Sequence, residues 1–263
     1  MTAEAFAPAK INLTLHVTGQ RTDGYHLLDS LVVFADIGDR LWFSPAPQLQ
    51  ITVTGPFADG VPTDRRNLVW RAAEVAGWTG QITLEKNLPH GAGIGGGSSD
   101  AAALLRSFGA LDQALSLGAD VPVCLSAKPQ RMRGIGEVLE PLAPLPKLEI
   151  VLVNPRVPVP TGQVFAGLTS KQNPPMPALP EFTDVAAFCC WLGAQRNDLE
   201  LPARAVAPQI DTALGALEGA LFARMSGSGA TCFGLYERGA ASAAAQIAQA
   251  HPDWWVRAGR VLR

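Results

Sequence analysis

The stretch Gly91-Ala92-Gly93-Ile94-Gly95-Gly96-Gly97-Ser98-Ser99-Asp100 constrains the local fold more than any other part of the chain. Its five glycines within seven residues leave the backbone N–H groups uncovered and allow positive φ angles. A strand-like segment precedes it at 81–86, residues that favour helix N-caps end it at 98–100, and helix formers follow at 101–105. A glycine-rich loop that opens a helix gathers free N–H donors at the positive end of the helix dipole. The sequence therefore predicts a phosphate-binding loop, and the alternative is a tight connection without a ligand.

The spacing within this stretch distinguishes it from two common nucleotide loops. A Walker A loop needs a lysine after its last glycine, and Gly97 stands in that place. Gly91, Gly93 and Gly96 do have the spacing of a dinucleotide-binding loop. Such a loop should follow a buried parallel strand, and an acidic residue should stand at the end of the next strand. The preceding strand instead alternates apolar and polar residues, and Asp112 lies in a helix-like segment. A nicotinamide dehydrogenase is therefore the weaker interpretation.

Composition narrows the class of protein. The chain has 263 residues, enough for two modest domains, and its 48% hydrophobic and 17% charged residues indicate a globular protein. A net charge of −2 provides no electrostatic footprint for nucleic acid or an anionic membrane. The four cysteines lack C-x-x-C spacing, which indicates reduced, buried thiols. We find neither a signal peptide nor an apolar run long enough for a membrane span and expect a cytoplasmic protein.

Periodicity and turn residues predict the secondary structure. Asn67 should cap a helix that runs to about Ala76, and the helix after the glycine loop should end near Gly109. The second half of the chain predicts an α+β sandwich with a mostly antiparallel sheet, and residues 173–180 predict an irregular surface loop. The further expected strands are 11–17, 31–37, 40–43, 49–54 and 148–153, with a hairpin at 134–137 and a turn at 225–229; the further helices are 185–192, 199–206, 208–220 and 240–250.

Several polar residues have more than one interpretation from pattern alone. Lys10 and Asn12 point to the same face of a strand, and periodicity alone favours a solvated edge position for Lys10. Asp120, ahead of a proline, has the position of a turn or N-cap residue. We expect His16 on a strand surface and His90 as a neighbour of the loop.

Three separated segments resemble the three motifs of the GHMP kinase superfamily: Pro8–Leu13, Gly91–Asp100 and Met225–Ala230. Four further runs are similar to the branch that phosphorylates the 2-hydroxyl of 4-diphosphocytidyl-2-C-methyl-D-erythritol with ATP, in non-mevalonate isoprenoid biosynthesis. They are Thr18–His26, Gly118–Pro122, Gly134–Glu137 and Arg196–Glu200, and the G-Q-R-x-D-G-Y-H run within the first is specific to this branch. The alternative is another small-alcohol kinase of the homoserine or mevalonate type, which would have little use for the Tyr25–His26 pair.

The resemblance implies roles for residues that pattern alone leaves open. Asp120 would be the general base on the substrate hydroxyl, and Lys10 would pair with it. Ser99 would lie near Mg²⁺, the metal that accompanies the ATP co-substrate. ATP would be bound by Pro89, Gly91, Ala92, Gly93, Ile94, Gly95, Gly96, Gly97, Ser98 and Ser99.

The same resemblance implies a substrate site for the cytidine ester. Asn12 would touch the reacting end, together with Asp120. Tyr25 and Phe165 would stack on either side of the cytosine ring across a cleft between two domains, with His26 at its edge, and Thr161 would also bind substrate.

The implied fold is α+β with two domains: a ribosomal-S5-like N-terminal domain at 1–153 and a ferredoxin-like C-terminal domain at 154–263. Between Leu105 and Gly118 the chain is shorter than the resemblance suggests. We therefore expect a helix beside the ATP site to be trimmed or replaced.

Overall fold

The computed structural model describes residues 3–182 and 184–263, and its contacts divide the chain into two compact units. The first unit contains the chain up to Lys10, Gly38–His90 and Gly95–Ala127, and the second contains Ile11–Ile37, Gly91–Ile94 and Lys128–Arg263. The backbone thus passes from one unit to the other several times, and the glycine stretch is divided between them. The expected boundary after residue 153 stays a prediction, because these units are not consecutive segments.

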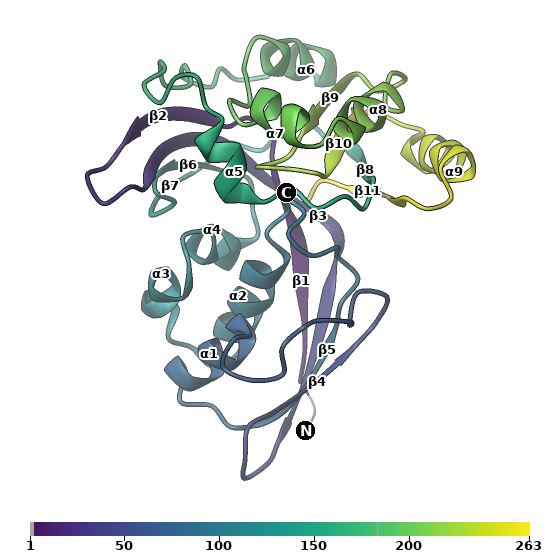
Figure 1. Cartoon of the computed structure of the whole chain (residues 1–263). Helices are drawn as coiled ribbons and strands as arrows, with labels where there is room; N and C mark the ends of the chain where they lie inside the picture. The colour runs from purple at the N-terminus through teal and green to yellow at the C-terminus, as the bar shows by residue number, and fades with distance from the viewer. Residues whose placement is uncertain (1–2, 183) are drawn as a thin grey trace. The chain divides into compact units, whose positions relative to one another are not determined.

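The first unit combines four strands with four helices and a short 3₁₀ turn. Strand β3 (His26–Pro45) supplies its second half to this unit, where it pairs antiparallel with β5 (Gly80–Glu85). Strand β4 (Gln50–Thr54) pairs parallel with β5, and β1 (Ala3–Asn12) pairs with β3. The helices gather on one side of these strands (Figure 1): α1 (Leu68–Val75), α2 (Gly96–Phe108), α3 (Ala114–Leu117) and α4 (Val121–Ser126).

The observed ends of α1 and α2 agree with the ends predicted from the sequence, except at the start of α2. The Asn67 side chain accepts a hydrogen bond from the Val69 N–H, which confirms the predicted cap of α1. Helix α2 ends beside Gly109 as expected, but it begins earlier, because Gly95 takes a left-handed conformation with φ of 63° and is itself the N-cap. The prediction that residues 98–100 cap this helix was therefore wrong.

The segment between α2 and α4 contains little regular structure, and the expected trimming of a helix beside the ATP site stays a prediction. Only a 3₁₀ turn (Leu111–Gln113) and the four-residue helix α3 fill the segment that leads to α4. At the end of α2, the ring of Phe108 stacks on Trp78 and meets Phe43 edge to face. These three rings fix the end of α2 against β3 by aromatic packing.

The second unit contains two groups of strands. In the first group, β2 (His16–Gln20) and β6 (Gln130–Gly134) both pair antiparallel with the first half of β3, and β6 forms the predicted hairpin with β7 (Val138–Pro141). The strands expected separately at 31–37 and 40–43 are one continuous strand, β3. Its alternation is obscured because residues 31–35 are all buried, as in a strand covered on both faces.

The other group is a four-stranded antiparallel sheet in the order β11-β8-β10-β9, which confirms the expected α+β arrangement. Its core is apolar and joins strands to helices through residues such as Val151, Ile210 and Ile247. The strands are β8 (Glu149–Asn154), β9 (Phe222–Met225), β10 (Cys232–Tyr236) and β11 (Trp255–Arg260); the helices are α5 (Thr161–Ala166), α6 (Val185–Gly193), α7 (Glu200–Val206), α8 (Gln209–Gly215) and α9 (Ala240–Ala250) (Figure 1).

One surface expectation in the second unit needs correction. His16 is buried, not on a strand surface, and burial lowers the pKa of its imidazole. The proline-rich segment 173–180 is irregular as expected, but it is anchored: Arg131 pairs with Asp29, and the Asp29 carboxylate accepts the backbone N–H of Met176, which is itself buried. Of the four cysteines, all free, Cys190 alone is exposed. No helix within residues 3–182 and 184–263 is long and apolar enough to cross a membrane.

Candidate active site

Lys10 and Asp120 form an ion pair within the first unit. Lys10 lies in β1 and Asp120 directly before α4, and the Lys10 Nζ donates to the Asp120 Oδ2 at 2.7 Å. The Lys10 side chain is 5% exposed and that of Asp120 38% exposed. The solvated edge position that periodicity favoured for Lys10 was therefore wrong, because other elements cover this end of β1. A buried ammonium thus fixes a carboxylate that solvent and a substrate can still reach.

The start of α2 lies against this pair. A Cβ added to Gly95 would lie 3.2 Å from the Cβ of Lys10, and the left-handed φ of Gly95 also favours glycine. Ser99 donates its backbone N–H to the Gly95 carbonyl and its hydroxyl to the Pro8 carbonyl, each at 2.8 Å. The first turn of α2, with the exposed Gly97, is therefore held next to Lys10 with free helix N–H groups at its end.

The other half of the glycine stretch is held within the second unit. Gly93 has a φ of 73°, and an added Cβ would lie 2.3 Å from the Ser226 carbonyl oxygen. The Ser226 hydroxyl donates to the Gly93 carbonyl at 2.9 Å and accepts the Asn12 N–H at 3.1 Å. Residues of all three sequence motifs therefore meet here, and only glycine fits at position 93.

Asn12 presents a polar atom without a protein partner. Its Nδ2 donates to the Ser30 hydroxyl at 2.8 Å, whereas its Oδ1 is buried and has no hydrogen-bond partner among the described residues. A buried acceptor without a partner is uncommon in proteins and suits a position that a ligand completes.

The Arg196–Glu200 run is hydrogen-bonded to the 225–229 turn. Asn197 donates its Nδ2 to the carbonyls of Met225 and Gly227, at 2.9 Å each. The Asp198 carboxylate accepts the Val17 N–H at 2.7 Å, and the Glu200 carboxylate accepts the Met225 N–H at 3.1 Å. This motif therefore fixes the 225–229 turn to the start of β2.

The three aromatic residues expected at the cytosine site all lie in the second unit. The His26 and Phe165 rings stack on each other, with centroids 4.5 Å apart and planes at 22°. Tyr25, next to His26 in the sequence, is 57% exposed. Thr161, at the start of α5, shares a hydrogen bond of 2.9 Å with the Ser228 hydroxyl. His26 thus covers one face of Phe165 in this conformation.

The His26 imidazole is neutral near pH 7. Burial and the nearby Lys171 ammonium both lower its pKa, and Lys171 itself donates to the Gln20 Oε1 at 3.1 Å. The His26 Nε2 is buried and has no hydrogen-bond partner in the part of the chain that the structure describes. A neutral imidazole with a vacant ring nitrogen can read one hydrogen-bonding edge of a ligand.

Sequence reasoning missed one group of charged residues near the loop. The Lys86 ammonium, buried behind Gly96, contacts the carboxylates of Asp39 and Asp100, which are also buried. The available signal was the position of Lys86 between β5 and Pro89, immediately before the glycine stretch. Pattern alone does not show that Asp39 reaches it from β3.

Two further residues, Pro89 and His90, precede the glycine stretch. Pro89 is buried before the loop and His90 is exposed beside it, as expected. Among the described residues there is no group of three or more His, Cys, Asp and Glu that could hold a metal.

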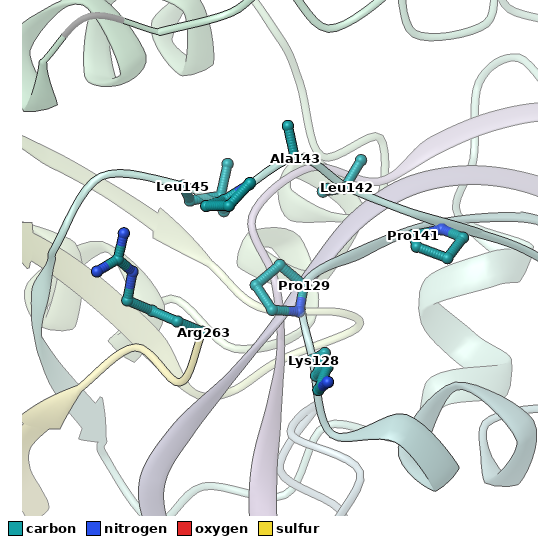
Figure 2. A pocket seen from close by; sticks show the side chains of 8 residues that line it. Lys128, Pro129, Pro141, Leu142, Ala143, Leu145 and Arg263 are labelled. Carbon is teal, nitrogen blue, oxygen red and sulfur yellow. The ribbon is translucent and has the colours of Figure 1, made fainter.

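A separate hollow of about 400 Å³ in the second unit contains none of the predicted residues (Figure 2). Its lining includes Lys128, Pro129, Pro141, Leu142, Leu145 and Arg263.

Comparison with known families identifies the class of protein. The model of the GHMP kinase N-terminal domain matches residues 67–128, and that of the GHMP kinase C-terminal region matches residues 176–253. The chain belongs to the GHMP kinase family, whose members use ATP as co-substrate.

Individual relatives define the branch. The chain is similar to the 4-diphosphocytidyl-2-C-methyl-D-erythritol kinase of Dinoroseobacter shibae, with 62% identity over 98% of this chain and 94% of the relative. It is also similar to a solved 4-(cytidine 5'-diphospho)-2C-methyl-D-erythritol kinase, with a TM-score of 0.78, 36% identity, and 98% and 99% of the two chains covered. A homoserine kinase from Cytophaga hutchinsonii shares the fold alone, at 18% identity and a TM-score of 0.64, with 99% of this chain and 95% of that one covered. Within the GHMP kinases, the chain is thus a member of the 4-diphosphocytidyl-2-C-methyl-D-erythritol kinase branch.

Proposed function

We propose that this chain phosphorylates the 2-hydroxyl of 4-diphosphocytidyl-2-C-methyl-D-erythritol with ATP, in the non-mevalonate route to isoprenoids. Similarity over nearly the full length to enzymes named for this substrate supports the acceptor. The observation that carries the reaction type is the Lys10–Asp120 pair at 2.7 Å, with Gly95 packed against Lys10. A kinase of the homoserine type is less well supported, because that likeness rests on the fold alone.

Asp120 is the general base in this proposal. An alcohol is a poor nucleophile until its proton is accepted in the transition state, and the accessible Asp120 carboxylate can take that proton as the new O–P bond forms. Lys10 orients the carboxylate and provides positive charge close to the reacting oxygens. The γ-phosphoryl group passes to the substrate oxygen and ADP leaves. Positioning and charge stabilisation supply most of the catalysis in such a transfer.

The ATP phosphates bind the glycine stretch in this proposal. Positive φ angles at Gly91, Gly93 and Gly95 expose backbone N–H groups, and the first turn of α2 adds the positive end of a helix dipole. Mg²⁺ accompanies ATP and is held mainly by phosphate oxygens and water, so a protein cage is not needed. The Ser99 hydroxyl oxygen keeps a free lone pair after donating to Pro8, which fits the predicted contact with the metal, although the side chain is fully buried in this conformation.

The cytidine end of the substrate is assigned to the second unit. Tyr25 and Phe165 provide aromatic faces, and the vacant His26 Nε2 provides an edge contact. Because His26 covers one face of Phe165, a base that stacks there has to displace the imidazole. The unpartnered Asn12 Oδ1 and the exposed Thr161 are further predicted contacts. We place the reaction in the cytoplasm, where ATP and reducing conditions suit the four free cysteines.

A coupled assay for ADP release tests the function directly. The wild-type chain is offered the cytidine diphosphate ester, homoserine and mevalonate as separate acceptors, with ATP and Mg²⁺. We expect turnover with the ester alone. Equal turnover with either other alcohol, or none with the ester, would overturn the assignment.

A further inference from the structure

Three buried charged residues join the two ends of the glycine stretch within the first unit. The Lys86 Nζ contacts the Asp39 Oδ2 and donates to the Asp100 Oδ2 at 2.6 Å. The other oxygen of Asp39 accepts the backbone N–H groups of Asn87 and Leu88, at 2.5 and 2.9 Å. Asp39 in β3 thus holds the residues just before Pro89, and Lys86 connects them to Asp100 in α2.

The cluster lies directly behind the first turn of α2. A Cβ added to Gly96 would lie 3.5 Å from the Lys86 Nζ and 3.6 Å from the Asp39 Oδ2. On the neighbouring residue, Gly95 packs against Lys10. Two buried lysines therefore support consecutive glycines at the start of this helix.

Stability alone does not account for such a cluster. Removing charges from water is costly, and replacing a buried ion pair by apolar side chains of similar volume is often neutral or stabilising. Here two carboxylates share one ammonium, and the Asp100 Oδ1 has no hydrogen-bond partner among the residues described. The bonds from Asp39 to the 87–88 backbone are directional contacts that apolar side chains would not reproduce.

We propose that Asp39, Lys86 and Asp100 are positioning residues that hold the glycine stretch in the geometry that binds the ATP phosphates. They act through the backbone of residues 87, 88 and 96 and need not touch ATP. This inference rests on the proposed role of the stretch in ATP binding. It predicts unequal contributions: both oxygens of Asp39 have partners, whereas one oxygen of Asp100 has none.

The test compares Asp39→Asn with Asp100→Asn in the full chain. Asp39→Asn keeps the shape but places an amide N–H₂ group against either the Lys86 ammonium or the backbone N–H groups. We expect the Kd of ATP by calorimetry and the KM of ATP to rise about ten- to hundredfold, the usual scale for a misplaced binding group. The KM of the cytidine ester should stay within about twofold. Asp100→Asn should also raise the Kd and KM of ATP, but by less than Asp39→Asn does, because one oxygen of Asp100 has no partner to lose.

A matched control separates positioning from general loss of stability. Asp29, equally buried and paired with Arg131 in the second unit, is changed to Asn. We expect Asp29→Asn to lower the Tm without changing the Kd of ATP. If Asp39→Asn does not fold, Asp39→Asn combined with Lys86→Met removes both charges together and takes its place.

A wild-type Kd of ATP in the folded Asp39 variant, or an equal rise in the Asp29 variant, would overturn the inference. If the wild-type chain binds ATP but phosphorylates another alcohol, the proposed substrate is wrong. The ATP measurements on the variants would still decide the role of Asp39, Lys86 and Asp100. Wild-type chain that does not bind ATP would overturn both proposals.

Discussion

Replacing Asp120 by Asn tests the proposed chemistry most directly. The change keeps the size of the side chain, and the Asn Oδ1 can still accept a hydrogen bond from the Lys10 ammonium, which lies 2.7 Å from the carboxylate in the wild type. The amide cannot accept the proton of the substrate hydroxyl. We therefore expect a folded protein that binds both substrates and turns over slowly.

The magnitude follows from the role and the geometry. Loss of a general base costs about two to four decades in kcat, which is about 3–5 kcal/mol of transition-state stabilisation. The Coulomb energy of a pair at 2.7 Å is about 6 kcal/mol at an effective dielectric constant of 20, before desolvation and before the 38% exposure of Asp120 reduces it. The hydrogen bond that Asn retains should limit the loss of folding free energy to about 1–3 kcal/mol.

The assay combines single-turnover kinetics with calorimetry. Single turnover measures the chemical step apart from product release, and calorimetry measures the Kd of ATP. Lys10→Ala should lose a similar number of decades, and the double variant should lose far less than the sum, since the two side chains act as a unit. A kcat within about tenfold of wild type in folded Asp120→Asn would refute the general-base role.

Three further perturbations test other parts of the site. Gly95→Val should abolish ATP binding by calorimetry, because a β-branched residue resists the φ of 63° and its Cβ would lie 3.2 Å from that of Lys10; an unchanged Kd would show that the loop is only structural. Tyr25→Ala or Phe165→Ala should raise the KM of the cytidine ester about ten- to a hundredfold, because each stacking contact with a base contributes about 1–3 kcal/mol, and should leave the KM of ATP unchanged. The wild-type enzyme should use the uridine analogue with a much lower kcat/KM, and equal use of both esters would contradict the His26 edge contact. Burial and the neighbouring Asp39 carboxylate outweigh the Lys86 ammonium and raise the pKa of Asp100 to about 8. The folded state therefore binds a proton that the unfolded state releases, and the free energy of unfolding should fall as the pH rises from about 4 to about 8. Asp100→Asn should remove that fall in a series of Tm measurements, and a parallel pH dependence in the two proteins would contradict the shift.

Local sequence signals predicted the elements well where one segment determines its own structure. Asn67 caps α1 because a side chain two residues away from its target N–H needs no tertiary partner. The same holds for the 134–137 hairpin and for helix α9. The start of α2 was misplaced because serines are strong caps in general, whereas here the left-handed Gly95 ends the loop first.

The site depended on contacts between distant segments, which periodicity does not contain. Lys10 pairs with Asp120, 110 positions away, and the resemblance to a family supplied that pair before any geometry was known. Asp39 and Lys86 carry no recognised motif, so their contact across 47 positions could not be predicted. His16 has the alternation of a surface residue, but the Arg196 N–H lies 3.4 Å from its Nε2 and the chain covers it.

The glycine stretch is divided between the two units, so a single variant cannot describe the whole of its proposed role in ATP binding. Gly93 is held by Ser226 in one unit, whereas Gly95 packs against Lys10 and Gly96 lies before Lys86 in the other. Each half of the loop is therefore set by its own neighbours, and the one peptide bond between Ile94 and Gly95 joins them. A variant at Asp39 should disturb residues 87 and 88 before the stretch and, through Lys86, the start of α2, but it should leave the Gly93–Ser226 hydrogen bond intact. The loss of ATP affinity that we expect from it would therefore exclude the contribution of that hydrogen bond. That separation makes the ATP-binding contribution of each half measurable.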